Sequence, residues 1–302
     1  MAKGTEQIWD VAVVGGGPAG MMAAGRAAEL GAKVILLEKN DTLGKKLLIT
    51  GGGRCNVTNA EPNVRAFLSK FKGNDKFLFS AFSQFGVKDT FDFFHLRDME
   101  TKIEAEKRAF PKSEKAESVW KVLIAYLAAG GVTVRSHSPV KELIGSNGAV
   151  TTIVLMNGSR IQARSYIIAT GGKSRPETGS TGDGFLWLQK LGHTVIEPDP
   201  ALVPLAIKDA WVKRLQGVTL PKVKLTLFQN GVKQEVKKGK LLFTHFGVSG
   251  PTIINMSKDV GELLKYGEVI LSLDLLPERD YGMLNKKLQE LFKAEHTKKF
   301  KN

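Results

Sequence analysis

The chain has 302 residues, of which 42% are hydrophobic and 25% charged, so it can form two domains with packed cores. Its single cysteine, Cys55, excludes an internal disulfide, and no apolar run reaches the length of a membrane span. The formal net charge is +14, but outside a lysine-rich stretch at 285–302 the basic residues are scattered, which argues against a nucleic-acid partner. We therefore expect a cytoplasmic protein with no membrane partner and no metal site.

The first predicted elements are a buried strand, a glycine turn, a helix and a second strand. Residues 11–20 read VAVVGGGPAG, a helix is predicted over 19–30, and residues 34–38 read VILLE. A strand, a glycine-rich turn and a helix followed by an acidic residue at this spacing are typical of a fold that binds the ADP half of a dinucleotide.

Four residues of this pattern have separate physical roles. Gly15 allows a sharp turn, Gly17 lets the backbone approach a pyrophosphate, and Gly20 lets the helix pack closely on the strand. Glu38 ends the second strand, where its carboxylate can accept hydrogen bonds from both ribose hydroxyls and would repel a 2′-phosphate. The pattern therefore predicts FAD or NAD rather than NADP.

The next segments alternate between helices and strands. Helical periodicity and cap residues predict helices from Asn74 to about 85, over 88–96 and, capped by Ser113, over 114–129, with a strand at 132–135. Three strands at 140–144, 149–155 and 159–163 are separated by Asn-Gly turns at 147–148 and 157–158, which predicts a meander. A buried strand, YIIATGG at 166–172, follows, and then a helix over 182–191.

A change of composition near residue 196 predicts a domain boundary. Prolines punctuate the segment 198–204, and the rest is rich in β-strand patterns. We expect an α/β fold with a Rossmann-like domain at 1–195 and a β-rich domain at 196–302. Strands of the second domain are expected at 202–207, 223–229, 232–237, 240–244 and 269–273, and a helix at 281–292.

The meander stands where a plain Rossmann fold has a helical crossover. In this respect the chain resembles flavoproteins of the two-dinucleotide-binding type. The resemblance implies that Ala169, Thr170 and Gly171 pass close to a cofactor and that Val140 contacts its adenine through the backbone.

Four longer motifs extend the resemblance over residues 11–256. They read GKKLLITGGGRCNVTN at 44–59, FPKSEKA at 110–116, ATGGKS at 169–174 with GSTGDG at 179–184, and LFTHFGVSGP at 242–251. Together they resemble the YhiN/BaiN-type flavoproteins, also called the aminoacetone oxidase family.

The resemblance implies an FAD-binding Rossmann domain and an inserted β-rich domain that covers the flavin. By motif, the ADP half is held by Gly15, Gly17, Gly20, Glu38 and Lys39, and the pyrophosphate and flavin by Lys45, Gly52, Gly53, Arg54, Cys55 and Asn56. The residue types agree, because consecutive glycines can present amide N–H groups to an anion and an arginine can bind phosphate in a bidentate manner. The alternative for 51–56 is an ordinary glycine-rich turn with a surface arginine.

Several candidate residues keep two interpretations. Cys55 is either a small buried residue or a redox thiol, and Asp183 is either a helix cap or a contact of the ribityl chain. His245, with Thr244 beside it, is either an acid or base facing the flavin or a hydrogen-bonded loop residue.

The expected function is that of an FAD-dependent oxidoreductase, a flavoprotein that transfers hydride to or from an unidentified small organic substrate. NAD(P)H is a candidate electron donor, although a second glycine fingerprint is missing. The alternatives are a flavoprotein that modifies tRNA and a truncated FAD-binding remnant without turnover.

The last expectation concerns the segment after Met256, which does not resemble the return of family members to the Rossmann domain. We expect that the sheet lacks a strand beside the first one, that FAD occupancy is weak, and that a C-terminal segment or a partner chain is missing. The alternative is a shortened family member whose residues 281–300 close the site.

Overall fold

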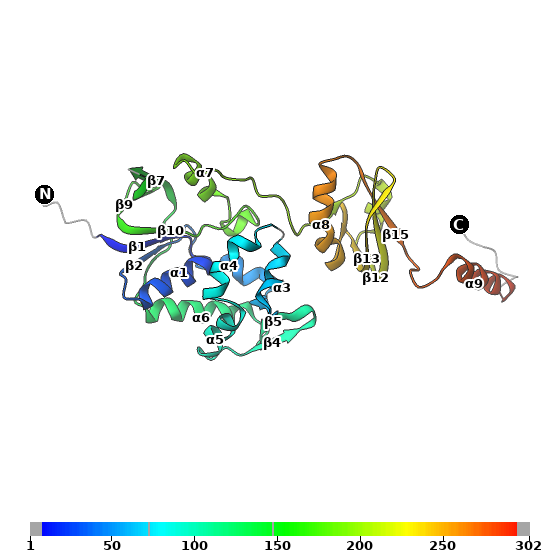
Figure 1. Ribbon diagram of the computed structural model, residues 1–302, viewed down its shortest axis with the longest axis horizontal. Coiled ribbons are helices and arrows are strands. Elements are labelled where there is room, and N and C mark those ends of the chain that lie inside the picture. The colour runs from blue at the N-terminus through cyan, green and yellow to red at the C-terminus, as the bar shows by residue number, and fades with distance from the viewer. Residues whose placement is uncertain (1–7, 72, 147, 295–302) are drawn as a thin grey trace. The chain divides into compact units, whose positions relative to one another are not determined.

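The computed structural model describes residues 8–71, 73–146 and 148–294. The chain divides into two compact units, the first ending at Ile196 and the second beginning at Glu197 (Figure 1). Asn147 of the first predicted Asn-Gly turn and the last lysines of the basic stretch lie outside the described residues.

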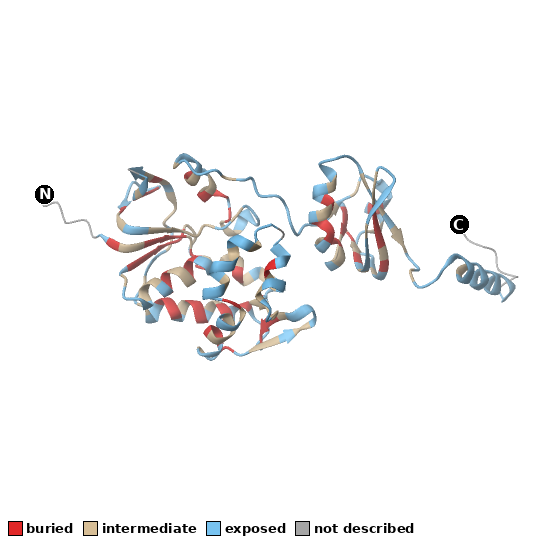
Figure 2. Cartoon of the chain, in the orientation of Figure 1, coloured by how far each residue is buried: buried red, intermediate tan, exposed pale blue. Residues whose placement is uncertain are grey.

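The first unit is built on a parallel sheet whose strands run in the order β10-β1-β2-β6. Val13 and Leu36 face helices α1 (Pro18–Glu29) and α6 (Ala116–Ala129), whereas Ala12 and Ile35 face the meander. Since both faces are covered, the central strands β1 and β2 are largely apolar, and Figure 2 shows them as mostly buried, whereas the edge strands β6 and β10 contain no buried residue. The strands of this sheet are β1 (Trp9–Val14), β2 (Val34–Leu37), β6 (Thr133–Arg135) and β10 (Ala163–Ile168).

Two small antiparallel sheets flank this core. The predicted meander is present as β7 (Val140–Ser146), β8 (Ala149–Leu155) and β9 (Arg160–Ile161). A further sheet, of order β3-β5-β4, was not predicted and comprises β3 (Thr58–Asn59), β4 (Thr101–Glu104) and β5 (Arg108–Pro111). The helices are α1 (Pro18–Glu29), α2 (Lys45–Ile49), α3 (Val64–Leu68), α4 (Asp75–Gln84), α5 (Val87–His95), α6 (Ala116–Ala129) and α7 (Asp183–Lys190).

Three local predictions were wrong. Asn74 precedes α4 but its side chain makes no capping hydrogen bond. Ser113 does not cap α6, which begins later, at Ala116, because the Ser113 hydroxyl pairs with that of Ser118 at 2.7 Å. The place beside β1 that was expected to be empty is filled by β10, since the strand after the meander pairs with β1 from Trp9 to Val14.

The second unit is an antiparallel sheet covered by one helix. The strand order is β11-β14-β13-β12-β15, and Ile253, Met256 and Val260 of α8 pack on Leu225 and Leu241. The two strands predicted at 232–237 and 240–244 are one continuous strand, and α8 was not predicted. The elements are β11 (Leu205–Ala206), β12 (Thr219–Gln229), β13 (Val232–Phe243), β14 (Gly247–Ser249), β15 (Val269–Asp274), α8 (Pro251–Leu264) and α9 (Tyr281–Ala294).

A glycine in α1 makes the packing of the first unit testable. A Cβ on Gly25 would lie 2.4 Å from ring atoms of Tyr126, whose hydroxyl donates to Glu29 at 2.9 Å. We expect Gly25→Ala to reduce the free energy of unfolding by about 1–3 kcal/mol, because the ring cannot move freely. Gly261→Ala in α8 is the control, since that Cβ meets no atom within 4 Å. Denaturant unfolding of both variants checks this, and equal stabilities would contradict it.

Candidate cofactor-binding site

The first unit contains a cavity of about 690 Å³ at the carboxyl ends of β1 and β2. All of its lining residues belong to this unit. Most of them come from the glycine turn, the start of α1, the end of β2, α2 with the turn that follows it, α5 and the segment 169–183. Others come from α6, the start of the meander and α7. The carboxyl edge of a parallel sheet is where this class of fold binds its ligands.

The glycine turn forms the side of the cavity next to α1. Gly15 has a φ of +105°, which favours glycine, and both Gly15 and Gly17 line the cavity. A Cβ on Gly17 would meet nothing within 4 Å, whereas one on Gly20 would lie 1.8 Å from the Gly15 carbonyl oxygen. Gly17 is therefore open toward a ligand, and Gly20 allows α1 to pack closely against the turn after β1, as predicted.

Glu38 lies at the end of β2 and is only 7% exposed. Its Oε2 accepts a hydrogen bond from the Gly16 amide at 2.7 Å. Its Oε1 accepts from the backbone and side-chain nitrogens of Asn40 at 2.8 and 2.7 Å. The carboxylate therefore shapes the glycine turn in addition to lining the cavity, a role that the sequence did not indicate.

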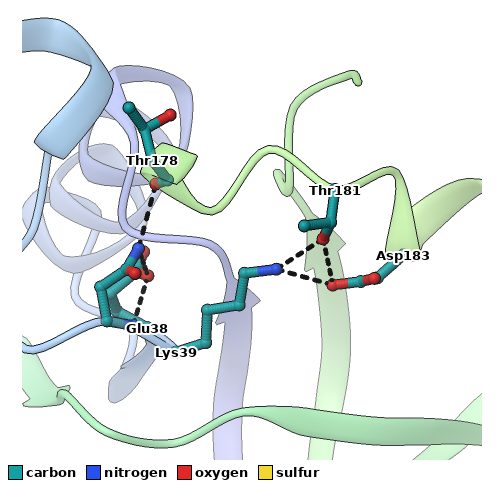
Figure 3. A network of polar contacts seen from close by, with 6 residues as sticks. Glu38, Lys39, Thr178, Thr181 and Asp183 are labelled. Carbon is teal, nitrogen blue, oxygen red and sulfur yellow. Dashed lines mark hydrogen bonds and ion pairs between the residues drawn. The ribbon is translucent and has the colours of Figure 1, made fainter. Parts of the chain in front are cut away.

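Lys39 contacts the far side of the cavity (Figure 3). Its Nζ donates to Thr181 Oγ1 at 2.6 Å and pairs with Asp183 Oδ2 at 2.8 Å. Burial raises the pKa of Asp183, but the hydrogen bonds from Lys39 and Thr181 outweigh this effect and hold the pKa below its ordinary value. Asp183 is therefore an ionised carboxylate at neutral pH.

The signature after α2 lies partly inside and partly outside the cavity. Lys45, Cys55 and Asn56 line it, and Lys45 Nζ pairs with Asp41 at 2.8 Å. Burial raises the pKa of the Cys55 thiol, so the thiol is neutral at neutral pH and is a poor nucleophile.

Gly52, Gly53 and Arg54 do not line the cavity. The Arg54 guanidinium pairs with Glu104 at 2.9 Å and stacks on the ring of Phe110, 4.1 Å from its centroid. The unpredicted sheet β3-β5-β4 supplies both partners, so the contact of Arg54 with a flavin stays a prediction.

The remaining predicted residues fall into two groups. Val140, Ala169, Thr170 and Gly171 line the cavity. Thr244 and His245 belong to the second unit, where Thr244 Oγ1 accepts from the Gly247 amide at 3.1 Å and the His245 ring lies 4.8 Å from that of Phe246. Their catalytic role stays a prediction.

Other lining residues were not singled out from the sequence. Asn40, Lys46, Thr178 and Ser180 are polar, whereas Phe85, Phe93, Phe94 and Trp187 supply apolar surface. The only sequence signal for these four polar residues was that they lie within or next to the recognised motifs. The aromatic residues were predicted at most as helix faces, because a helical pattern does not separate core from cavity wall.

The cavity fits a flavin dinucleotide. Helix α1 begins beside it with no acidic residue in its first turn and no side-chain cap, so its first amide N–H groups are available to a pyrophosphate. Glu38 provides the carboxylate that a ribose requires, and most of the remaining lining surface is apolar, which suits a flavin ring.

Comparisons with known proteins agree with this geometry. Residues 9–274 match the family model described as HI0933-like protein Rossmann domain. The chain is 32% identical to the 3-dehydro-bile acid delta(4,6)-reductase of Clostridium scindens, covering 91% of this chain and 66% of the relative. It is 30% identical to the ribosomal RNA dihydrouridine synthase of Escherichia coli, covering 90% of this chain and 65% of the relative. The chain thus spans slightly less than two thirds of the length of these relatives.

Solved flavoenzyme structures share the fold. A flavocytochrome c3 fumarate reductase in its open conformation aligns with a TM-score of 0.56 at 21% identity, covering 72% of this chain and 48% of that one. The 3-ketosteroid delta1-dehydrogenase of Sterolibacterium denitrificans aligns with a TM-score of 0.53 at 16% identity, covering 72% and 61%. Among the described residues, no helix has the length and hydropathy needed to cross a membrane.

The match over residues 9–274 covers most of the chain and includes the motifs on which the YhiN/BaiN resemblance was based. That resemblance is confirmed, and so is the prediction of a Rossmann-type α/β fold with additional antiparallel sheets. The chain therefore belongs to the HI0933-like family of flavoprotein oxidoreductases.

Proposed function

We propose that this chain binds FAD in the cavity of its first unit and supports hydride transfer between the flavin and a small organic substrate. The observation that carries the proposal is the meeting of the open Gly17 backbone, the uncapped start of α1 and the buried Glu38 carboxylate around one cavity. This set suits a pyrophosphate and a ribose, and a 2′-phosphate would be repelled by Glu38.

Different groups would bind different parts of the cofactor. Gly15, Gly17 and the first amides of α1 would hold the pyrophosphate, and Glu38 would accept hydrogen bonds from the ribose. Lys45 would place a positive charge in the cavity, and Phe93 and Phe94 would exclude water from it. When bound, the flavin supplies the two-electron redox chemistry. In the second unit, His245 is the proposed acid or base, with Thr244 beside it as a further catalytic candidate. NAD(P)H is the proposed electron donor.

The names of the relatives suggest a substrate class. A delta(4,6)-reductase and a dihydrouridine synthase both add hydrogen across a carbon–carbon double bond. We infer that the substrate of this chain contains such a bond.

Modification of RNA is the second candidate function, because one relative is named for ribosomal RNA and the chain carries a net charge of +14. A cytoplasmic location is also proposed, since the single cysteine suits a reducing compartment.

Release of the cofactor from purified protein tests the proposal. The protein is denatured and the released compound is identified by chromatography and mass spectrometry, with FAD as the expected result. If only FMN is released, or if no flavin is bound even after incubation with FAD, the proposal is wrong. Anaerobic reduction with NADH and with NADPH then identifies the donor, and reoxidation by a steroid enone or by uridine-containing RNA separates the two substrate classes.

A further inference from the structure

The loop between β10 and α7, residues 171–182, is called the strap here. Gly171, Thr178, Gly179 and Ser180 of the strap line the cavity. Its backbone takes left-handed conformations at Gly171, Arg175, Gly179 and Gly182. Glycine adopts this conformation without strain, but Arg175 does so at a cost, so its conformation persists only where surrounding contacts hold the loop.

Three side chains from residues 39–46 provide such contacts. Asn40 Nδ2 donates to the Thr178 carbonyl at 3.1 Å, and Lys39 Nζ donates to Thr181 at 2.6 Å. Lys46 Nζ donates to Ser174 Oγ at 2.6 Å. Figure 3 shows the first two contacts, to Thr178 and Thr181, together with the pair of Lys39 with Asp183. The strap is thus tied at several points to the segment that also carries Glu38.

The strap also lies in close contact with this segment. A Cβ on Gly179 would be 2.6 Å from Asn40 Nδ2 and 3.2 Å from Lys39 Cε. Asn40 Nδ2 bonds both Glu38 and the strap, so the position of the carboxylate and that of the strap are coupled. The tethers are individually weak, since the side chains of Lys39 and Asp183 are 30% and 40% exposed and their pair is screened by solvent.

We propose that Lys39 and Asn40 are positioning residues that hold the strap against the end of β2, and that the held strap slows the release of the bound cofactor. The identity of that cofactor rests on the proposed function. Lys39 lines the cavity, but its ammonium group bonds Thr181 and Asp183, so its proposed part in binding is indirect. This differs from the motif-based expectation that Lys39 holds ADP itself.

Thr181→Val is the most informative variant, because Thr181 is exposed and does not line the cavity. Lys39→Met removes the same tether, and Lys39→Arg keeps a donor there. Lys45→Met is the matched control, since Lys45 lines the cavity but pairs with Asp41 outside the strap. Two rates are measured: cleavage of the flavin-free protein after Glu177 by a glutamate-specific protease, and release of FAD into excess competing ligand.

We expect Thr181→Val to raise both rates about fivefold, the factor for one net hydrogen bond. Lys39→Met, which also removes the pair with Asp183, should raise them at least as much, and Lys39→Arg should stay close to the parent. Lys45→Met is expected to weaken FAD binding without changing the cleavage rate. Unchanged cleavage in Thr181→Val and Lys39→Met overturns the inference, as does faster cleavage without faster FAD release. If the parent takes up no FAD, the proposed function fails, and the cleavage rates still decide whether the tether exists.

Discussion

Alanine substitutions at two glycines of the same motif are expected to have different effects, one on stability and the other on cofactor affinity. Gly20→Ala should reduce the free energy of unfolding by about 3 kcal/mol or more, because its Cβ would lie 1.8 Å from the Gly15 carbonyl oxygen. That atom belongs to the backbone of a turn that is held to β2, since the Gly15 amide donates to Leu37 O at 2.8 Å. The clash cannot be relieved by a change of rotamer.

Gly17→Ala should fold normally and lose cofactor affinity. Gly17 has φ −74° and ψ 177°, which alanine adopts without strain, and its Cβ would meet no protein atom within 4 Å. The new methyl group would project toward the space proposed for the pyrophosphate. We expect the Kd for FAD to rise about 10- to 100-fold.

Denaturant unfolding of the flavin-free proteins and FAD titration separate the two effects. The flavin-free state is used because ligand binding would itself change the apparent stability. If Gly17→Ala binds FAD as tightly as the parent, the pyrophosphate does not lie at this turn. If Gly20→Ala is as stable as the parent, the close contact between α1 and the turn is wrong.

Glu38→Gln is expected to lower FAD affinity about 100-fold or more. The carboxylate accepts hydrogen bonds through both oxygens, from Gly16 on one side and Asn40 on the other. Glutamine has only one oxygen, so its NH₂ group would face a donor in a site that is 7% exposed. Charge-assisted hydrogen bonds contribute about 1.5–3 kcal/mol each, and an unpaired buried donor costs about 1–3 kcal/mol. The variant should therefore disturb the glycine turn and the proposed ribose contact together.

Glu177→Gln is the matched control, because Glu177 is on the strap, 59% exposed, and pairs only loosely with Arg175 at 3.4 Å. FAD titration and thermal unfolding should show the control to be close to the parent. An equal affinity for FAD in Glu38→Gln and the parent would remove Glu38 from the proposed site. A loss of stability without a loss of affinity would assign it to the glycine turn alone.

Local patterns were sufficient to predict much of the first unit. The motif from Val11 to Glu38 predicted two strands, the turn and the helix, because each depends on residues near in sequence: apolar runs, glycines and one terminal acid. The meander was predictable for the same reason, since its turns carry their own glycines. The family could also be recognised from sequence, because its signatures are contiguous.

Contacts between distant segments were decided only by the tertiary structure. Arg54 points to Glu104, fifty residues away in sequence, because an unpredicted sheet lies beside it. Helix α8 was missed, as were the capping positions of α4 and α6, where neighbouring hydroxyls and backbone geometry override the local preference. Lys39 was assigned to the ligand from its motif and lines the cavity, but its hydrogen bonds to Thr181 and Asp183 could not be read from the motif.

The fold class, the family and the place of the dinucleotide motif could therefore be predicted, because all three depend on short-range spacing and composition. Tertiary packing sets which side chains line the cavity and which bond to neighbouring protein groups. The physical reason is that the partner of a polar side chain is set by the closest donor or acceptor in space. For Glu38, Lys39 and Arg54 these partners are brought together by the packing of separate elements around one sheet.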